Sequence, residues 1–170
     1  MVKKIYLLIY YVIIKNLPHS RYYKGFNGIR IWYMKRILKI HSGGQNSFFE
    51  NGVYIGSAEG ISIGENTQIN ENVFLQKVQI SNNCLIAPNV VILSESHEYN
   101  STTEPIRTQG NKPSRKVIID ENTWIGRSTI ILPGIQIGAN SIIGAGSIVT
   151  KDIPSNSIAA GNPCRVIKQR

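Results

Sequence analysis

The sequence predicts an all-β protein that folds as a parallel β-helix with triangular coils. Two observations carry this prediction: a six-residue period runs through most of the chain, and an aliphatic residue occupies the third position of every repeat. Hydrophobic residues make up 42% of the 170 residues, which is enough for the core of one ordinary domain. Glycine and isoleucine are plentiful, which favours strands and turns over a helical bundle.

The six-residue period is clearest in two stretches. From Val117 the chain reads VIIDEN, TWIGRS, TIILPG, IQIGAN, SIIGAG and SIVTKD. From Ile61 it reads ISIGEN, TQINEN, VFLQK (one residue short), VQISNN, CLIAPN and VVILSE. This period matches neither an α-helix nor an alternating strand. We therefore expect three repeats to form one coil, with these third-position residues stacked inside the prism: Ile63, Ile69, Leu75, Ile80, Ile86, Ile92, Ile119, Ile125, Ile131, Ile137, Ile143 and Val149.

Glycine, asparagine and aspartate recur at the predicted corners of the coils. Glycine follows the inward aliphatic residue at Gly126, Gly138 and Gly144. We expect glycine there to supply a tight corner backbone, and Asn and Asp at other corner positions to tolerate the same conformations. A stack of coils leaves its core open at both ends, so we also expect a cap at each end.

The N-terminal segment differs in composition from the repeat region. Residues 1–49 hold nine Lys and Arg and no acidic residue, whereas residues 50–170 hold ten of each sign. We therefore expect a basic, apolar cap segment over residues 1–50 and a β-helix domain with a short C-terminal tail over residues 51–170. The charge indicates either contact with an anionic surface or a solvated face. A nucleic-acid partner is not expected.

Two apolar stretches lie within the cap segment. The run that begins at Ile5 is about ten residues long, too short to span a bilayer as a helix. No cleavage site follows it, so we expect the run to be retained. The stretch IRIWYMKRILKI (29–40) is compatible with a basic amphipathic helix whose apolar positions include Ile29 and Trp32. We favour a cover over the open end of the prism; the alternative is peripheral contact of residues 1–40 with an anionic membrane.

The period breaks between residues 95 and 116, where the sequence is polar and holds two prolines. We expect this stretch to leave the prism as an extruded loop, which is where a rigid scaffold most often carries function. The loop opens with His97, the one histidine of three in the repeat region. A neutral imidazole accepts a proton near physiological pH. His97 is therefore the candidate base; a histidine without a catalytic role is the alternative.

The cysteines indicate neither a disulfide framework nor a zinc site. Cys84 and Cys164 lie far apart and have no partner spacing. We interpret both as structural, and a reducing cytoplasm fits two free thiols. A zinc enzyme on this scaffold would need three histidines around one metal. Only His97 is available in the repeat region, so no metal is expected.

Residues 52–168 resemble the hexapeptide-repeat acyltransferases. The resemblance rests on the repeats, the loop with its opening histidine, and the ending WIGRSTIILPGIQIGANSIIGAGSIVTKDIPSNSIAAGNPCRVI. It is strongest to the galactoside and maltose O-acetyltransferases and to O-acetyltransferases of polysaccharide gene clusters. The resemblance implies a left-handed β-helix, acetyl-CoA as cosubstrate, a sugar or glycan acceptor, and a homotrimer with active sites between neighbouring prisms.

The resemblance also implies roles for individual residues. His97 matches the general base of the family, and Asn70 matches a residue that contacts the acceptor sugar. The backbone around Gly126 and Arg127 matches the position beside the acetyl thioester. Three further matches line the pantetheine arm of acetyl-CoA: Ala145, Thr150 and Lys151. Two matches lie at its nucleotide end: Arg165 and Lys168.

These observations together predict an O-acetyltransferase that acylates a sugar hydroxyl of a surface polysaccharide or its precursor. We expect it in the cytoplasm; if residues 1–40 contact a membrane, it would be peripheral at the inner membrane face. The stretch VFLQKV lacks the acidic pair that the galactoside branch carries before the loop, which disfavours free galactosides and maltose as acceptors. Two alternatives stay open. One is an N-acyltransferase of an amino sugar or another small acceptor; the other is a non-catalytic β-helix used in assembly.

Overall fold

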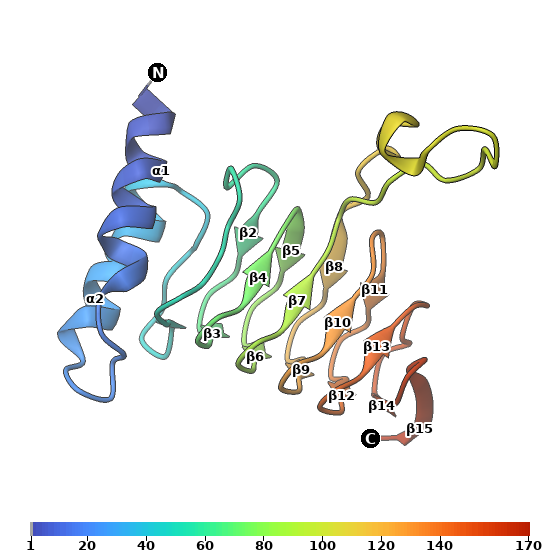
Figure 1. The fold of residues 1–170 in the computed structure, drawn as a ribbon. Coiled ribbons are helices and arrows are strands. Elements are labelled where there is room, and N and C mark those ends of the chain that lie inside the picture. Colours follow the sequence, from blue (N-terminus) through green and yellow to red (C-terminus); the bar gives the residue numbers. More distant parts are fainter. Residues whose placement is uncertain (1) are drawn as a thin grey trace.

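The structure is a computed structural model and describes residues 2–170. Stacked coils form a prism in the middle of the molecule, helices lie across one end, and a loop projects from one side (Figure 1). The last strand folds back at the opposite end of the prism (Figure 1). The protein is thus a left-handed parallel β-helix with a helical N-terminal segment, as the repeat pattern and the resemblance predict.

The helical elements are short and all but one precede residue 40. They are α1 (Val2–Val12), the 3-10 turn η1 (Ile14–Asn16), α2 (Gly25–Trp32), the π-helical turn η2 (Tyr33–Ile37) and the 3-10 turn η3 (Ile106–Thr108). The strands are β1 (Phe48–Phe49), β2 (Ser62–Ile63), β3 (Gln68–Ile69), β4 (Phe74–Leu75), β5 (Val78–Ile80), β6 (Leu85–Ile86), β7 (Val91–Ile92), β8 (Val117–Ile119), β9 (Trp124–Ile125), β10 (Ile130–Ile131), β11 (Gln136–Ile137), β12 (Ile142–Ile143), β13 (Ile148–Val149), β14 (Ser157–Ala160) and β15 (Arg165–Gln169).

Three sheets form the three faces of the prism. Their strand orders are β1-β3-β6-β9-β12-β14-β15, β4-β7-β10-β13 and β2-β5-β8-β11. All pairings are parallel except that of β14 with β15. All twelve residues predicted to point inward are at most 2% exposed, which confirms the expected register. For example, Ile69 lies opposite Ile86, which lies opposite Ile125.

The reason for the corner glycines differs from the prediction. Gly126 does not adopt a left-handed conformation; instead, a Cβ atom there would lie 2.5 Å from the backbone nitrogen of Ala145 in the next coil. Glycine at this position therefore permits close stacking of coils. The left-handed conformation falls two residues later and is mostly taken by asparagine, which tolerates it better than most residues: Asn66, Asn72, Asn83, Asn89, Asn122 and Asn140.

The β-helix pairing reaches back into the segment expected to be the cap. His41 pairs with Ile63, and β1 pairs with β3, both in parallel. The first partial coil therefore begins at about residue 41, before the predicted boundary at residue 50. The division of the chain at that boundary stays a prediction.

The helices close the N-terminal end of the core. Tyr10 of α1 and Met34 of η2 are fully buried and belong to the same hydrophobic cluster as Phe49 and Val53 of the first coil. The hydroxyl group of Tyr10 donates to the carbonyl oxygen of Val53 at 2.6 Å. The helical segment therefore covers the open end of the prism, which is the cap interpretation that the sequence favoured.

The orientation of the second helix differs from its apolar pattern. Ile29 and Trp32 point outward and are 43% and 56% exposed, whereas Arg30 is fully buried. Arg30 is held there by Glu50, whose carboxylate lies 2.9 Å from a guanidinium nitrogen, and by the carbonyl oxygen of Phe49. The buried ion pair, rather than the apolar side chains, thus decides which face of α2 meets the prism.

Candidate active site

His97 lies on a short two-stranded stem at the base of the projecting loop. It pairs with Asn111 in an antiparallel bridge, and the N–H of Lys112 donates to the carbonyl oxygen of Ser96 at 2.9 Å. The side chain of His97 is exposed. The stem fixes the backbone of His97 while leaving its imidazole accessible to a ligand.

Buried Ser94 fixes the root of the loop to the prism. Its N–H donates to Oε1 of Gln76 at 2.6 Å, and its carbonyl oxygen accepts from the N–H of Arg115 at 2.9 Å. Its hydroxyl group lies 3.2 Å from that of Ser114 on the returning strand. Both ends of the loop are therefore anchored to one residue, three positions before the candidate base.

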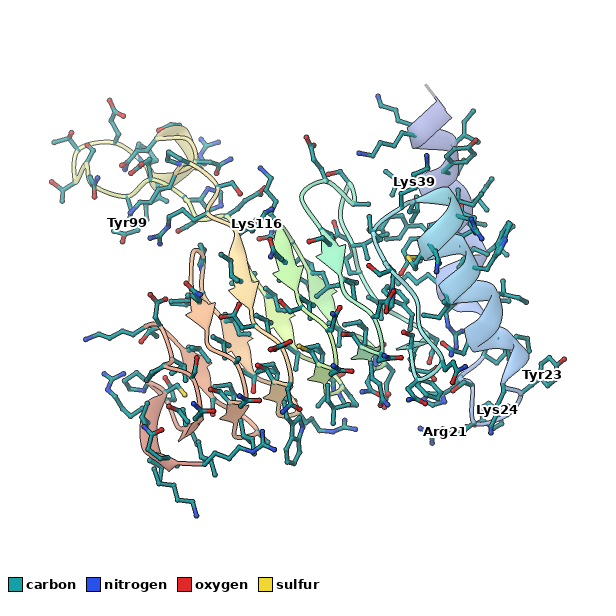
Figure 2. The ribbon with its side chains drawn as sticks, turned by 180° about the vertical axis from the view of Figure 1, so that it is seen from behind. Arg21, Tyr23, Lys24, Lys39, Tyr99 and Lys116 are labelled. Carbon is teal, nitrogen blue, oxygen red and sulfur yellow. The ribbon has the colours of Figure 1, made fainter. Side chains whose placement is uncertain are left out.

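A cleft of about 590 Å³ lies between the loop and the prism. Its walls include Tyr99 and Lys112 from the loop, and Pro133, Thr150 and Lys151 from the corners of the coils. The ammonium group of Lys112 lies 3.7 Å from the centre of the Tyr99 ring, a cation–π contact. Figure 2 shows Tyr99 on the projecting loop. Two of the predicted pantetheine contacts thus face the same space as the loop.

Four other predicted site residues lie along a different corner of the prism. Because β3, β9 and β12 belong to one sheet, the residues that follow them lie at the same corner. These residues are Asn70, Gly126 with Arg127, and Ala145. The side chain of Asn70 donates to the carbonyl oxygen of Ile86 at 2.8 Å.

Near Gly126, two backbone N–H groups of this corner form no hydrogen bond within residues 2–170. The N–H of Gly126 is not one of them, because it donates to the carbonyl oxygen of Ile143 at 2.8 Å. The N–H groups of Arg127 and Ala145 donate to no acceptor within residues 2–170. Donors of this kind can stabilise a developing oxyanion when they are fixed in place.

Glu71 places a carboxylate between the guanidinium of Arg127 and the imidazole of His19, beside Asn70. One oxygen lies 3.7 Å from the guanidinium of Arg127, and the other lies 3.6 Å from Nε2 of His19. The other ring nitrogen of His19 lies 3.7 Å from the carboxylate of Glu50. The sequence analysis missed this cluster, because His19 and Glu71 are distant in sequence and Glu71 occupies an ordinary corner position of its repeat.

Within one chain, His97 and Asn70 lie at different corners. His97 follows β7, whose sheet also contains β4, β10 and β13, whereas Asn70 follows β3 of the neighbouring sheet. Thr150 follows β13 and so shares the corner of His97. One chain thus presents His97 and Asn70 at separate corners of the prism.

The two basic residues predicted to meet the nucleotide lie at the C-terminal end. Arg165 and Lys168 lie in β15 and are exposed. One guanidinium nitrogen of Arg165 donates to the carbonyl oxygen of Cys164 at 2.8 Å. Neither residue forms an ion pair within residues 2–170, so both charges are available to an anion.

The two cysteines are buried and free, in agreement with a structural role. Burial raises the pKa of the Cys84 thiol to about 11, and burial also raises the pKa of the Cys164 thiol. Both side chains are therefore neutral thiols near pH 7, and a neutral thiol is a poor nucleophile. Across residues 2–170, the structure contains no group of three or more His, Cys, Asp or Glu residues placed to hold a metal ion.

Comparison with known proteins gives consistent matches. Residues 116–151 match the bacterial transferase hexapeptide family (six repeats). The galactoside O-acetyltransferase of Escherichia coli K12 is 44% identical over 129 residues, which cover 74% of this chain and 62% of the relative. The chain thus spans about three-fifths of the length of that relative, and 53% of the galactoside O-acetyltransferase of Lactococcus lactis.

Two solved structures resemble nearly the whole chain. The maltose O-acetyltransferase of Clostridium difficile 630 is 32% identical with a TM-score of 0.76, over 99% of this chain and 86% of that one. A galactoside acetyltransferase in complex with coenzyme A is 36% identical with a TM-score of 0.77, over 98% of this chain and 78% of that one. The chain therefore belongs to the hexapeptide-repeat acyltransferase family, in the group that includes the galactoside and maltose O-acetyltransferases.

Proposed function

We propose that the protein is an acetyl-CoA-dependent O-acetyltransferase that acts on a sugar hydroxyl group of a surface polysaccharide or its precursor. The observation that carries this proposal is the stem that holds His97 next to a cleft lined by Thr150 and Lys151. The chain belongs to the acyltransferase family, which gives this geometry its meaning. The named activities of the relatives, and the coenzyme A bound to one of them, support an acetyl-CoA cosubstrate.

His97 acts as the general base in this proposal. A sugar hydroxyl group is a poor nucleophile until a base within hydrogen-bond reach removes its proton. As the proton moves to the imidazole, the hydroxyl oxygen attacks the thioester carbonyl carbon and forms a tetrahedral intermediate. The C–S bond then breaks, and the imidazolium returns the proton to the departing sulfur. Transfer is direct, within a ternary complex.

The open backbone N–H of Arg127 stabilises the oxyanion in this scheme. It lies at the corner that the family resemblance assigns to the thioester, and the preceding N–H of Gly126 is already used between coils. Ala145 offers a second open N–H further along the same corner to the pantetheine arm. Arg165 and Lys168 meet the phosphates of the nucleotide end as exposed cations.

The complete site lies between neighbouring chains of a homotrimer. His97 of one chain approaches the corner of Asn70 and Arg127 on the next, since one chain alone holds these groups at separate corners. In this arrangement Asn70 contacts the acceptor. Glu71 lies beside it and offers a fixed carboxylate to the hydroxyl groups of the sugar.

The test measures coenzyme A release from acetyl-CoA with a panel of sugars, oligosaccharides and amino sugars. We expect turnover with acceptors that carry a free hydroxyl group and no amine, and mass spectrometry of the product should locate an ester. Turnover with amino sugars alone, giving an amide, would establish N-acylation instead. Failure to bind acetyl-CoA in a calorimetric titration would contradict the proposed acetyl transfer and would favour a non-catalytic β-helix used in assembly.

A further inference from the structure

Helix α1 carries two apolar stripes on opposite sides. One stripe packs on the prism and includes Tyr10, which is fully buried. The other faces outward, and its residues recur at the i, i+3, i+4, i+7 spacing of one helix face. This outer stripe consists of Ile5, Leu8, Ile9 and Val12, which are 50%, 63%, 36% and 61% exposed. A surface helix of a soluble protein normally carries polar residues on that side.

Exposed apolar side chains also lie on α2. The hydroxyl group of Tyr33, in η2 directly after α2, donates to the carbonyl oxygen of Tyr6 in α1 at 2.7 Å, so η2 is in direct contact with α1. On α2, Ile29 and Trp32 point outward. We call the outer stripe of α1 together with Ile29, Trp32 and exposed Ile13 the cap face. A group of exposed apolar side chains on neighbouring helical elements often marks an interaction site.

The segment that carries the cap face is rich in unpaired positive charge. Of the nine basic residues among residues 1–49, seven are exposed, and none of the seven forms an ion pair within the described part of the chain. These are Lys3, Lys4, Arg21, Lys24, Lys35, Arg36 and Lys39. Figure 2 shows Arg21 and Lys24 at one end of the cap and Lys39 at the other. No acidic residue lies in this segment to offset them.

We propose that the cap face binds the surface of an anionic lipid bilayer, with α1 lying in the plane of the interface. Aliphatic side chains with an aromatic anchor and a rim of cations are the features of an interfacial helix. The aliphatic residues and Trp32 would enter the headgroup boundary, while the lysines and arginines meet lipid phosphates. None of the helices within residues 2–170 has the length and apolar character of a membrane span.

Charge favours a lipid surface over a second copy of the same face. Two cap faces brought together would join two segments that carry fourteen exposed cations in total, since residues 1–49 of each chain supply seven and contain no acidic residue. Such a contact is repulsive in water. An anionic bilayer instead matches both the apolar residues and the charge. This proposal is independent of the proposed acetyl transfer.

Vesicle flotation with the full chain tests the proposal. Vesicles of phosphatidylcholine alone are compared with vesicles that contain phosphatidylglycerol, at low and high salt. We expect the protein to float with the anionic vesicles at low salt and to be released by high salt or by neutral lipid, because exposed charges are screened. Replacing Leu8 and Val12 together by Ser, or Lys35 and Arg36 together by Glu, should weaken vesicle binding about tenfold or more.

A matched control uses apolar residues at the other end of the prism. Val166 and Ile167 are 43% and 65% exposed, and replacing both by Ser should leave vesicle binding unchanged. Circular dichroism and thermal unfolding verify that each variant folds. Binding that is equal for neutral and anionic vesicles, or unaffected by the Leu8 and Val12 changes, would overturn the proposal. A second result would also overturn it: the wild type does not bind vesicles, and light scattering shows that replacing Leu8 and Val12 by Ser changes the oligomeric state. That result would place the cap face between chains.

Discussion

At the scale of single residues, His41 is buried where the cap meets the first coil, and its ring is only half paired. Nδ1 accepts a hydrogen bond from the N–H of Gly43 at 2.8 Å, so the neutral ring carries its proton on Nε2, which has no partner within residues 2–170. Burial, with a further contribution from the charge of Lys35, lowers the pKa of His41 to about 4. The folded protein therefore holds His41 neutral.

This histidine should make stability depend on pH. An unfolded histidine takes up a proton near pH 6.5, whereas folded His41 does so only near pH 4. Its contribution to the free energy of unfolding is therefore fully present above pH 6.5. As the pH falls from 6.5 to 4, this contribution decreases by about 3 kcal/mol. Urea unfolding at several pH values should show a shallower acid loss for His41→Gln than for the wild type. Equal pH dependence of the two proteins would refute the assignment.

Glu71 provides a second prediction at this scale. Glu71→Gln keeps the shape of the side chain but removes the charge between His19 and Arg127. If Glu71 holds the acceptor, we expect the KM for the acceptor to rise about tenfold or more, while the KM for acetyl-CoA changes little. Steady-state kinetics with each substrate varied in turn gives both values. Glu65→Gln at an exposed corner is the control, and an unchanged acceptor KM in Glu71→Gln would remove Glu71 from the site.

The sequence predicted the inward residues of the prism but not these polar clusters. The hexapeptide period is a local pattern, so it specifies positions such as Ile69 and Ile125 without knowledge of the rest of the chain. The contact between His19 and Glu71 depends instead on how the cap settles on the first coils, which no short-range pattern encodes. The role of Gly126 was also misjudged, since its constraint comes from the next coil.

At the scale of elements, the cap is held by the buried pair of Arg30 and Glu50. Removing one member of a buried ion pair leaves the other charge uncompensated, at a cost of about 3–5 kcal/mol. We therefore expect Arg30→Ala to lower the free energy of unfolding by about that amount. Arg36→Ala, at an exposed position of the same segment, should change it by less than about 0.5 kcal/mol. Equal denaturation midpoints for the two variants would show that the pair does not hold the cap.

The extruded loop and the helical cap were both predictable as elements. A break in a strict period marks the loop, and the core of a solenoid requires a cover at its end. The face that α2 presents was not predictable, because its apolar pattern points Ile29 and Trp32 toward the core. Desolvation of Arg30 is offset by Glu50 and by the carbonyl groups of Phe49, Leu17 and Pro18. All of these partners come from outside the helix.

At the scale of the whole molecule, the candidate site divides between two corners of the prism. Apart from His97, the sequence assigned residues to a site only through the family resemblance. The corner at which a residue leaves the prism follows from the coil count and not from the chemistry of the residue. Sharing between chains makes a specific prediction. Asn70→Ala and His97→Ala chains can be mixed in equal amounts and reassembled. Each shared site then has an even chance of an intact His97 from one chain and an even chance of an intact Asn70 from the next, so about a quarter of wild-type activity should return. If each site lay within one chain, the mixture would stay as inactive as its parents.

The most direct test of the proposed mechanism compares the turnover of acetyl-CoA by the wild type and by His97→Ala, with an acceptor identified from the panel. We predict that kcat/KM falls about a hundredfold or more, while calorimetry gives an unchanged affinity for acetyl-CoA, because loss of a general base slows proton transfer without removing the cosubstrate contacts. Equal turnover by the two proteins would contradict the assignment of His97 as the base.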